Sequence, residues 1–100
     1  MLWAIARVAA PNFAAMREKV LQPHLDYLHS QKKILVVSGA TLTDDGNEII
    51  GSLLLVNVNS RAEAKAFVDG DPFTKAGMFK SATITRMRKG QWNPQAAEGA

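Results

Sequence analysis

His24 is the side chain of this 100-residue sequence that most clearly combines a reactive group with a position expected to be buried. A helical wheel that starts at Phe13 and steps about 100° per residue places His24 near 20°, in the middle of an apolar stripe. Arg17 falls near 40° on the same stripe. Buried polar groups need partners, because leaving them unpaired costs free energy. His24 is therefore either a core histidine bonded to backbone or a pocket base, and Arg17 either a pocket cation or a side chain reaching water.

Asp71 is the carboxylate with the most informative neighbours, since Pro72 and Phe73 follow it. An aspartate before proline is a good N-cap for a short helix, and that is its simplest interpretation. Phe73 and Phe79 are expected in the core or, alternatively, in the wall of an aromatic pocket. Ser38 is the best hydroxyl nucleophile, but no pattern brings it to a histidine. Proton transfer is therefore favoured over covalent catalysis.

We expect no metal ion and no redox cofactor. The chain has no cysteine, which excludes disulfides and thiolate ligands and fits a reducing compartment. His24 and His29 lie five residues apart, roughly 140° around a helix, and cannot chelate one ion together. The seven glycines are scattered and form no G-x-G-x-x-G phosphate loop.

The charge and the apolar runs narrow the choice of partner. The net charge is +3, from 12 Lys and Arg against 9 Asp and Glu, and its densest basic stretch is Arg86, Arg88 and Lys89. Nucleic-acid modules usually present a broader basic stripe with stacking aromatics, so we expect no nucleic acid. Apolar runs such as Leu53 to Val56 are too short for a signal peptide or a membrane span. We expect a cytoplasmic protein with a small-molecule partner.

The elements that must position these side chains alternate between strand and helix. Apolar and β-branched content predicts strands over residues 2–8, 33–42, 48–58 and 79–88. Apolar spacing, a capping box at Ser60 to Glu63 and the stop before Pro72 predict helices over residues 12–31 and 60–68, with one more turn at 72–77. The order predicts an α+β fold of the ferredoxin-like split βαββαβ type. Two helices then cover one face of a four-stranded antiparallel sheet.

Three of these strands are apolar on both faces, whereas a sheet with one wet face alternates apolar and polar residues. The runs are Leu2–Ala6, Ile34–Val37 and Leu53–Val56. Because two helices cover only one face, the other would be a large apolar patch. We therefore expect a homodimer through this sheet face; the alternative is a monomer that tolerates scattered apolar residues. Residues 1–89 are predicted to form one domain, and residues 90–100 a C-terminal tail.

Several short motifs resemble the YciI-like (YCII-related) family. They are Asp71-Pro72-Phe73 followed by Lys75-Ala76-Gly77, then His24-Leu25 with Arg17 upstream, and Ser38-Gly39 at the end of the second strand. The resemblance runs from Leu2 to about Lys89 in the same element order, although Ala40 stands where many members have proline. It implies a small dimeric protein with a ferredoxin-like α+β barrel.

The resemblance also implies a function. His24 and Asp71 would form a catalytic dyad within hydrogen-bonding reach, with one carboxylate oxygen capping the short helix and the other facing the imidazole. The substrate pocket would take in Arg17, Ser38, Gly39, Pro72 and Phe73. One activity in the family is the dehydrochlorination of a chlorinated hydroxyhydroquinone in aromatic degradation, a lyase reaction that needs no cofactor. The alternative is a non-catalytic dimeric module that binds a small metabolite in the same pocket.

Overall fold

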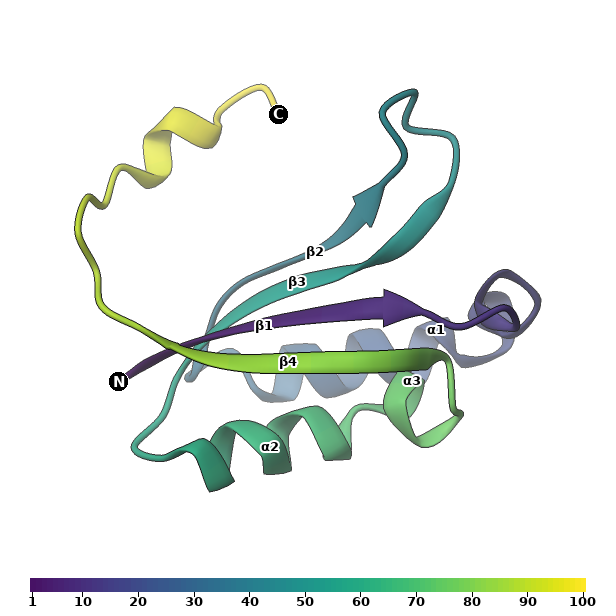
Figure 1. The fold of residues 1–100 in the computed structure, drawn as a ribbon, viewed down its shortest axis with the longest axis horizontal. Coiled ribbons are helices and arrows are strands. Elements are labelled where there is room, and N and C mark those ends of the chain that lie inside the picture. Colours follow the sequence, from purple (N-terminus) through teal and green to yellow (C-terminus); the bar gives the residue numbers. More distant parts are fainter.

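The computed structural model describes all residues 1–100, which form one sheet with helices on one side (Figure 1). The strands are β1 (Leu2–Ala9), β2 (Leu35–Leu42), β3 (Ile49–Asn57) and β4 (Phe79–Met87). The helices are α1 (Phe13–Ser30), α2 (Arg61–Gly70) and α3 (Pro72–Lys75), and a 3-10 turn, η1, covers Pro94–Ala97. All strand pairs are antiparallel in the order β2-β3-β1-β4. The predicted α+β fold with βαββαβ order is confirmed.

Local hydrogen bonds explain where the shorter elements begin and turn. The Ser60 hydroxyl accepts the Glu63 N–H at 3.1 Å, as the predicted capping box requires, and this bond opens α2. The Glu63 carboxylate reaches one residue further back than the box requires and accepts the Asn59 N–H at 2.9 Å. In the β2–β3 hairpin, Gly46 has a φ of 76°, a left-handed conformation that glycine adopts without a steric cost.

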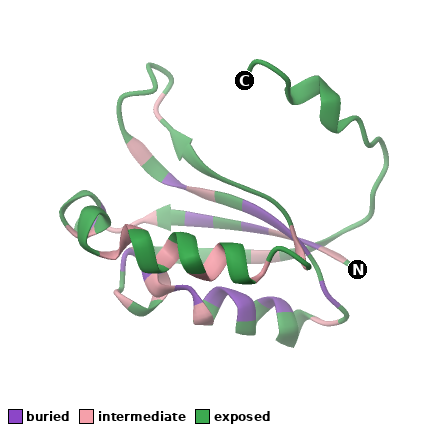
Figure 2. Cartoon of the chain, turned by 180° about the vertical axis from the view of Figure 1, so that it is seen from behind, coloured by how far each residue is buried: buried purple, intermediate pink, exposed green.

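The main core lies between α2 and the helix-facing side of the two central strands. Figure 2 shows the buried residues concentrated in β1, β3 and α2. The main core consists of Trp3, Ile5, Leu54, Val56, Val58, Ala64, Phe67 and Val68. A smaller cluster of Phe13, Phe73 and Met78 closes the opposite end of the fold, where α1 meets α3. The main core therefore anchors α2, and α1 packs against the smaller cluster with its N-terminal half and against the main core only through the partly buried Tyr27 and Leu28.

The apolar stripe of α1 is less buried than the wheel predicts. Phe13 is the only buried residue of this helix. The other apolar residues of the stripe are only partly buried: Met16, Val20, Leu21, Tyr27 and Leu28. Leu21, Leu25 and Leu28 face a cavity between the helix and the sheet. Arg17 is also exposed, at the side of that cavity, and is not buried within the stripe. No helix of the chain has the length and apolar character needed to span a membrane.

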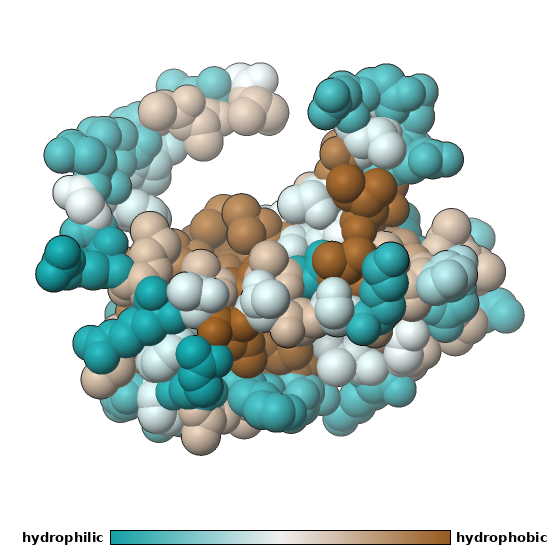
Figure 3. All heavy atoms as spheres, in the orientation of Figure 1, coloured by the Kyte–Doolittle hydropathy of each residue, from teal (hydrophilic) through white to brown (hydrophobic).

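The sheet face away from the helices is apolar and uncovered within the chain. Val8, Val37, Leu53 and Met87 point to this side and are 43%, 53%, 52% and 43% exposed. Figure 3 shows apolar atoms gathered here, between the C-terminal segment and the β2–β3 hairpin. The C-terminal segment leaves β4 and curves over this side without packing against it (Figure 1). We call this surface the open face.

The C-terminal segment adds no buried side chain to the domain. Every residue from 88 to 100 is exposed, and η1, which the sequence did not predict, is a short local turn. Truncation after Gly90 should therefore change the free energy of unfolding by less than about 0.5 kcal/mol. By contrast, Leu54→Ala should cost about 2–5 kcal/mol, because Leu54 is 2% exposed. Circular dichroism melts compare the two variants, and loss of cooperative melting in the truncated protein would contradict the prediction.

Candidate active site

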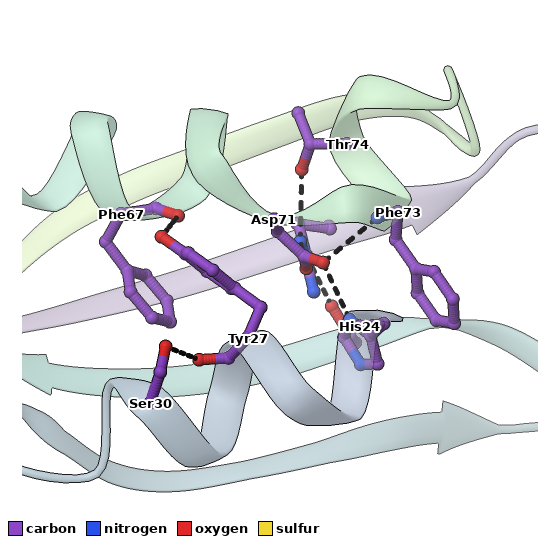
Figure 4. Close-up of polar contacts among 9 residues, drawn as sticks. His24, Tyr27, Ser30, Phe67, Asp71, Phe73 and Thr74 are labelled. Atoms are coloured by element: carbon purple, nitrogen blue, oxygen red, sulfur yellow. Dashed lines mark hydrogen bonds and ion pairs between the residues drawn. The ribbon is translucent and has the colours of Figure 1, made fainter. Parts of the chain in front are cut away.

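Asp71 lies at the junction of α2 and α3, where its carboxylate is 1% exposed and fully paired (Figure 4). Oδ1 accepts the Phe73 N–H at 3.0 Å, which caps α3, and lies 2.7 Å from Nδ1 of His24. Oδ2 accepts a hydrogen bond from Nη1 of Arg7 at 2.7 Å. One carboxylate thus connects β1, α1 and α3.

The predicted contact between His24 and Asp71 is present, but the carboxylate is shared differently. The sequence suggested one oxygen for the helix cap and the other for the imidazole. Instead Oδ1 makes both contacts, because Arg7 holds Oδ2. Sequence reasoning missed Arg7, although a signal existed. It alternates with Trp3 and Ile5 along a strand, so its side chain points to the buried face and needs a counter-charge.

The protonation states follow from these contacts. Burial alone would raise the pKa of Asp71, but the hydrogen bonds from His24, Arg7 and the Phe73 N–H outweigh it and hold the pKa below its usual value. Burial lowers the pKa of Arg7 and the nearby carboxylate opposes that shift, so the guanidinium stays charged at neutral pH. An ionised carboxylate can only accept. In the neutral imidazole, Nδ1 therefore carries the proton and Nε2 holds the free lone pair.

Aromatic rings fix the orientation of the imidazole. The ring of His24 stacks on Phe73 with a centroid distance of 3.7 Å and an interplanar angle of 2°. Phe13 meets Phe73 edge-on at 5.6 Å, and Phe79 lies beneath the Arg7 guanidinium at 4.0 Å. Nε2 of His24 has no partner in the protein. Every fully buried side-chain nitrogen has a hydrogen-bond partner, so Nε2, which has none, must be accessible. His24 lines the adjoining cavity, and Nε2 is therefore open to it.

A cavity of about 250 Å³ opens between α1, β2 and β3. Of the predicted binding residues, Arg17, Ser38, Gly39 and Phe73 line it together with His24, whereas Pro72 does not and occupies the first turn of α3. The 16 lining residues also include Arg7, Phe79, Ser52 and Ala40. They contain two arginines and no acidic residue, so the cavity favours an anionic ligand. No group of three or more His, Asp or Glu side chains is placed to hold a metal ion.

Tyr27 sets the spacing of the two longer helices beside the carboxylate. Its hydroxyl donates to the Phe67 carbonyl at 2.7 Å (Figure 4). Burial and, secondarily, the charge of Asp71 raise the pKa of Tyr27, which keeps the hydroxyl protonated. A Cβ at Gly70 would lie 2.5 Å from the Tyr27 oxygen. The glycine at this position therefore leaves room for the Tyr27 ring between α1 and α2.

The fold and the site together define a ferredoxin-like α+β domain, in which a buried carboxylate pairs with an imidazole beside a small cavity. Comparison with known proteins identifies the family of this domain. The family model of the YCII-related domain matches residues 1–88, and the chain belongs to this family. The resemblance inferred from the sequence is confirmed.

One solved structure gives a closer comparison. It is the 5-chloro-2-hydroxyhydroquinone dehydrochlorinase of Burkholderia phenoliruptrix, in complex with 2,5-dihydroxybenzoquinone. The two chains are 35% identical, with a TM-score of 0.80, and the match covers 90% of this chain and 96% of the dehydrochlorinase. A comparison with curated protein sequences found no match.

The pairing of Asp71 predicts a large cost for removing its charge. In Asp71→Asn, the buried Arg7 loses its counter-charge, so we expect a loss of about 3–5 kcal/mol in the free energy of unfolding. Asp69→Asn is the matched control, since the Asp69–Lys65 pair is exposed and should contribute less than about 1 kcal/mol. Urea unfolding at pH 7 measures both variants, and equal stabilities would contradict the assigned role of Asp71.

The same pair predicts how stability depends on pH. Because the pKa of Asp71 is lower in the folded state, the unfolded state binds more protons at acidic pH. The stabilisation is complete above the unfolded value of about 4 and is lost as pH falls through the lower folded pKa. Between about pH 5 and pH 2, wild type should therefore lose stability more steeply than Asp71→Asn. Parallel pH profiles in urea unfolding would count against it.

Proposed function

We propose that the protein is an enzyme that removes hydrogen chloride from a chlorinated hydroxyhydroquinone. The observation that carries the proposal is the imidazole of His24, which is bonded at Nδ1 to Asp71 and open at Nε2 to the cavity. Pockets for drug-sized ligands usually start at roughly 300 Å³. The cavity here, at about 250 Å³, lies just below that size and suits a single ring. The similarity to a dehydrochlorinase supports this substrate class.

The proposed reaction needs one base that moves two protons. Nε2 of His24 takes the proton of a ring hydroxyl, and the oxygen electron pair enters the ring. The imidazolium then protonates the neighbouring carbon that bears chlorine, which leaves a ketone and a tetrahedral carbon. Nε2 next removes the proton of the hydroxyl across the ring, and the electrons shift through the enol to expel chloride. The C–Cl bond breaks, a quinone forms, and the atoms and electrons balance without an outside oxidant.

Asp71 acts through His24 in this proposal. The carboxylate holds the tautomer that leaves Nε2 unprotonated, and it stabilises the imidazolium between the two proton transfers. Stacking on Phe73 keeps the ring from rotating away. Because Asp71 is itself fixed by Arg7 and by the cap of α3, the base is positioned before substrate arrives.

Replacing the base tests the proposal directly. His24→Ala should lower the turnover of 5-chloro-2-hydroxyhydroquinone by roughly 10²- to 10⁴-fold, the usual contribution of acid–base catalysis. His29→Ala is the matched control, because His29 is exposed on the same helix and does not line the cavity. Chloride release measures turnover, and circular dichroism verifies that both variants fold.

Two results would overturn the proposal in different ways. Equal turnover in wild type and His24→Ala would remove the histidine from the mechanism. A wild-type protein that binds 2,5-dihydroxybenzoquinone but releases no chloride from the chlorinated substrate would be a binding module and not this enzyme.

We also propose that the protein forms a homodimer through the open face. Val8, Val37, Leu53 and Met87 form an exposed apolar surface, and monomers rarely expose large surfaces of this kind. The C-terminal segment curves over the same side without packing on its own sheet (Figure 1), and Trp92 in this segment is 51% exposed. A second copy seated on the open face would meet both surfaces.

A charge in the centre of the open face should prevent this association. Leu53→Glu is expected to give a folded monomer, since Leu53 is 52% exposed and lies outside the core. Ala66→Glu adds the same charge to the exposed side of α2 and should leave the dimer intact. Light scattering at micromolar concentration reports the mass, and a monomeric wild type would contradict the proposal.

A further inference from the structure

The pair with Asp71 does not use all the donors of Arg7. Its Nε donates to the Ser52 hydroxyl at 2.8 Å, and its Nη1 donates to Asp71 at 2.7 Å and to the Thr74 hydroxyl at 3.3 Å. Nη2 has no acceptor in the protein. Every fully buried side-chain nitrogen has a hydrogen-bond partner, so the unpaired Nη2 must be accessible. Since Arg7 lines the cavity, Nη2 faces the cavity.

Ser52 places a second donor beside this nitrogen. Arg7 and Ser52 are directly opposite each other on β1 and β3, and both line the cavity. The Ser52 oxygen accepts from Nε, while its own proton has no acceptor in the protein. Nε and Nη2 share one edge of the planar guanidinium. The free N–H and the free O–H therefore lie next to each other on the sheet side of the cavity.

We propose that Arg7 and Ser52 form a binding site for an anionic oxygen on the substrate ring. Arg7 supplies a charge-assisted hydrogen bond, and Ser52 supplies a neutral one to the same oxygen. The lining favours a negative ligand, since it holds Arg7 and Arg17 and no carboxylate. Asp71 lies behind Arg7 and outside the lining, so it orients the guanidinium without repelling the ligand at close range.

This site refines the substrate class, and in that respect it rests on the proposed function. His24 needs a hydroxyl that can give up a proton, and Arg7 with Ser52 needs an oxygen that is already ionised. The substrate is therefore a single ring with at least two oxygen substituents, one of them acidic enough to ionise near neutral pH. Chlorine and quinone carbonyls withdraw electrons and make ring hydroxyls acidic in this way. Rings that carry ethers in place of hydroxyls should bind poorly.

Binding of two quinones tests the site without requiring turnover. Wild type should bind 2,5-dihydroxy-1,4-benzoquinone, which is anionic at pH 7, more tightly than its neutral 2,5-dimethoxy counterpart. Arg7→Lys keeps the charge beside Asp71 but loses the planar set of guanidinium donors, and should weaken dihydroxyquinone binding roughly 10- to 100-fold. Ser52→Ala should weaken it roughly threefold to tenfold. Neither variant should change binding of the dimethoxyquinone.

Three further variants make the result specific. Ser81→Ala, an exposed serine on another strand and outside the cavity lining, should bind both quinones as wild type does. Arg17 is exposed at the side of the cavity, so any loss in Arg17→Gln should vanish at high salt, whereas the loss in Arg7→Lys should persist. His24→Ala should retain the preference for the dihydroxyquinone. If Arg7→Lys does not fold, Ser52→Ala carries the test, because Ser52 is outside the Asp71 pair.

The outcomes separate this inference from the proposed function. Wild-type affinity and preference in both Arg7→Lys and Ser52→Ala would overturn the oxygen site, even if His24→Ala abolished chloride release. A preference that depends on Arg7 and Ser52 would support the site, even if wild type released no chloride.

Discussion

A buried carboxylate between an arginine and a histidine organises this molecule. Asp71 receives Arg7 from β1, His24 from α1 and the first turn of α3, so three separate parts of the chain converge on two oxygen atoms. Taking such charges out of water costs several kcal/mol for each ion, and only complete pairing offsets that cost. Because the pairing is complete, the carboxylate stays ionised, and the tautomer of His24 follows from it. Stability and the proposed chemistry therefore depend on the same group.

The elements of the fold were predictable because their signals are local. β-branched runs, the capping box at Ser60 and the proline after Asp71 define strands and helices to within a few residues, and the element order then selects the topology. How far the apolar side of α1 is buried was not predictable. Periodicity tells which side of a helix faces inward, but it does not tell whether a packed core or a cavity lies there. Leu21 and Leu28 have the expected direction and border a cavity.

The candidate site was predictable in part. His24 was conspicuous as an imidazole on an apolar stripe, and Asp71 as an aspartate before proline that caps a helix. Their pairing as a site was implied by the family resemblance and not by either pattern alone. Arg7 was missed, since it lies in a strand recognised by its overall composition and not by which side chains alternate toward the helices. Ser52 carries no sequence signal, because its role arises from the β1–β3 register, which joins residues 45 positions apart.

The glycine under the Tyr27 hydroxyl has a consequence for how such a pocket can diverge. A side chain at Gly70 would push on the Tyr27 ring, since its Cβ would lie 2.5 Å from the hydroxyl oxygen and 3.0 Å from Cζ, and Tyr27 lies on the same helix as His24. In β2, a Cβ at Gly39 would meet no atom within 4 Å, and it would point to the open face, because Gly39 pairs with Leu53. A side chain at Gly39 would therefore change the open face, whereas one at Gly70 would press on the helix that holds His24.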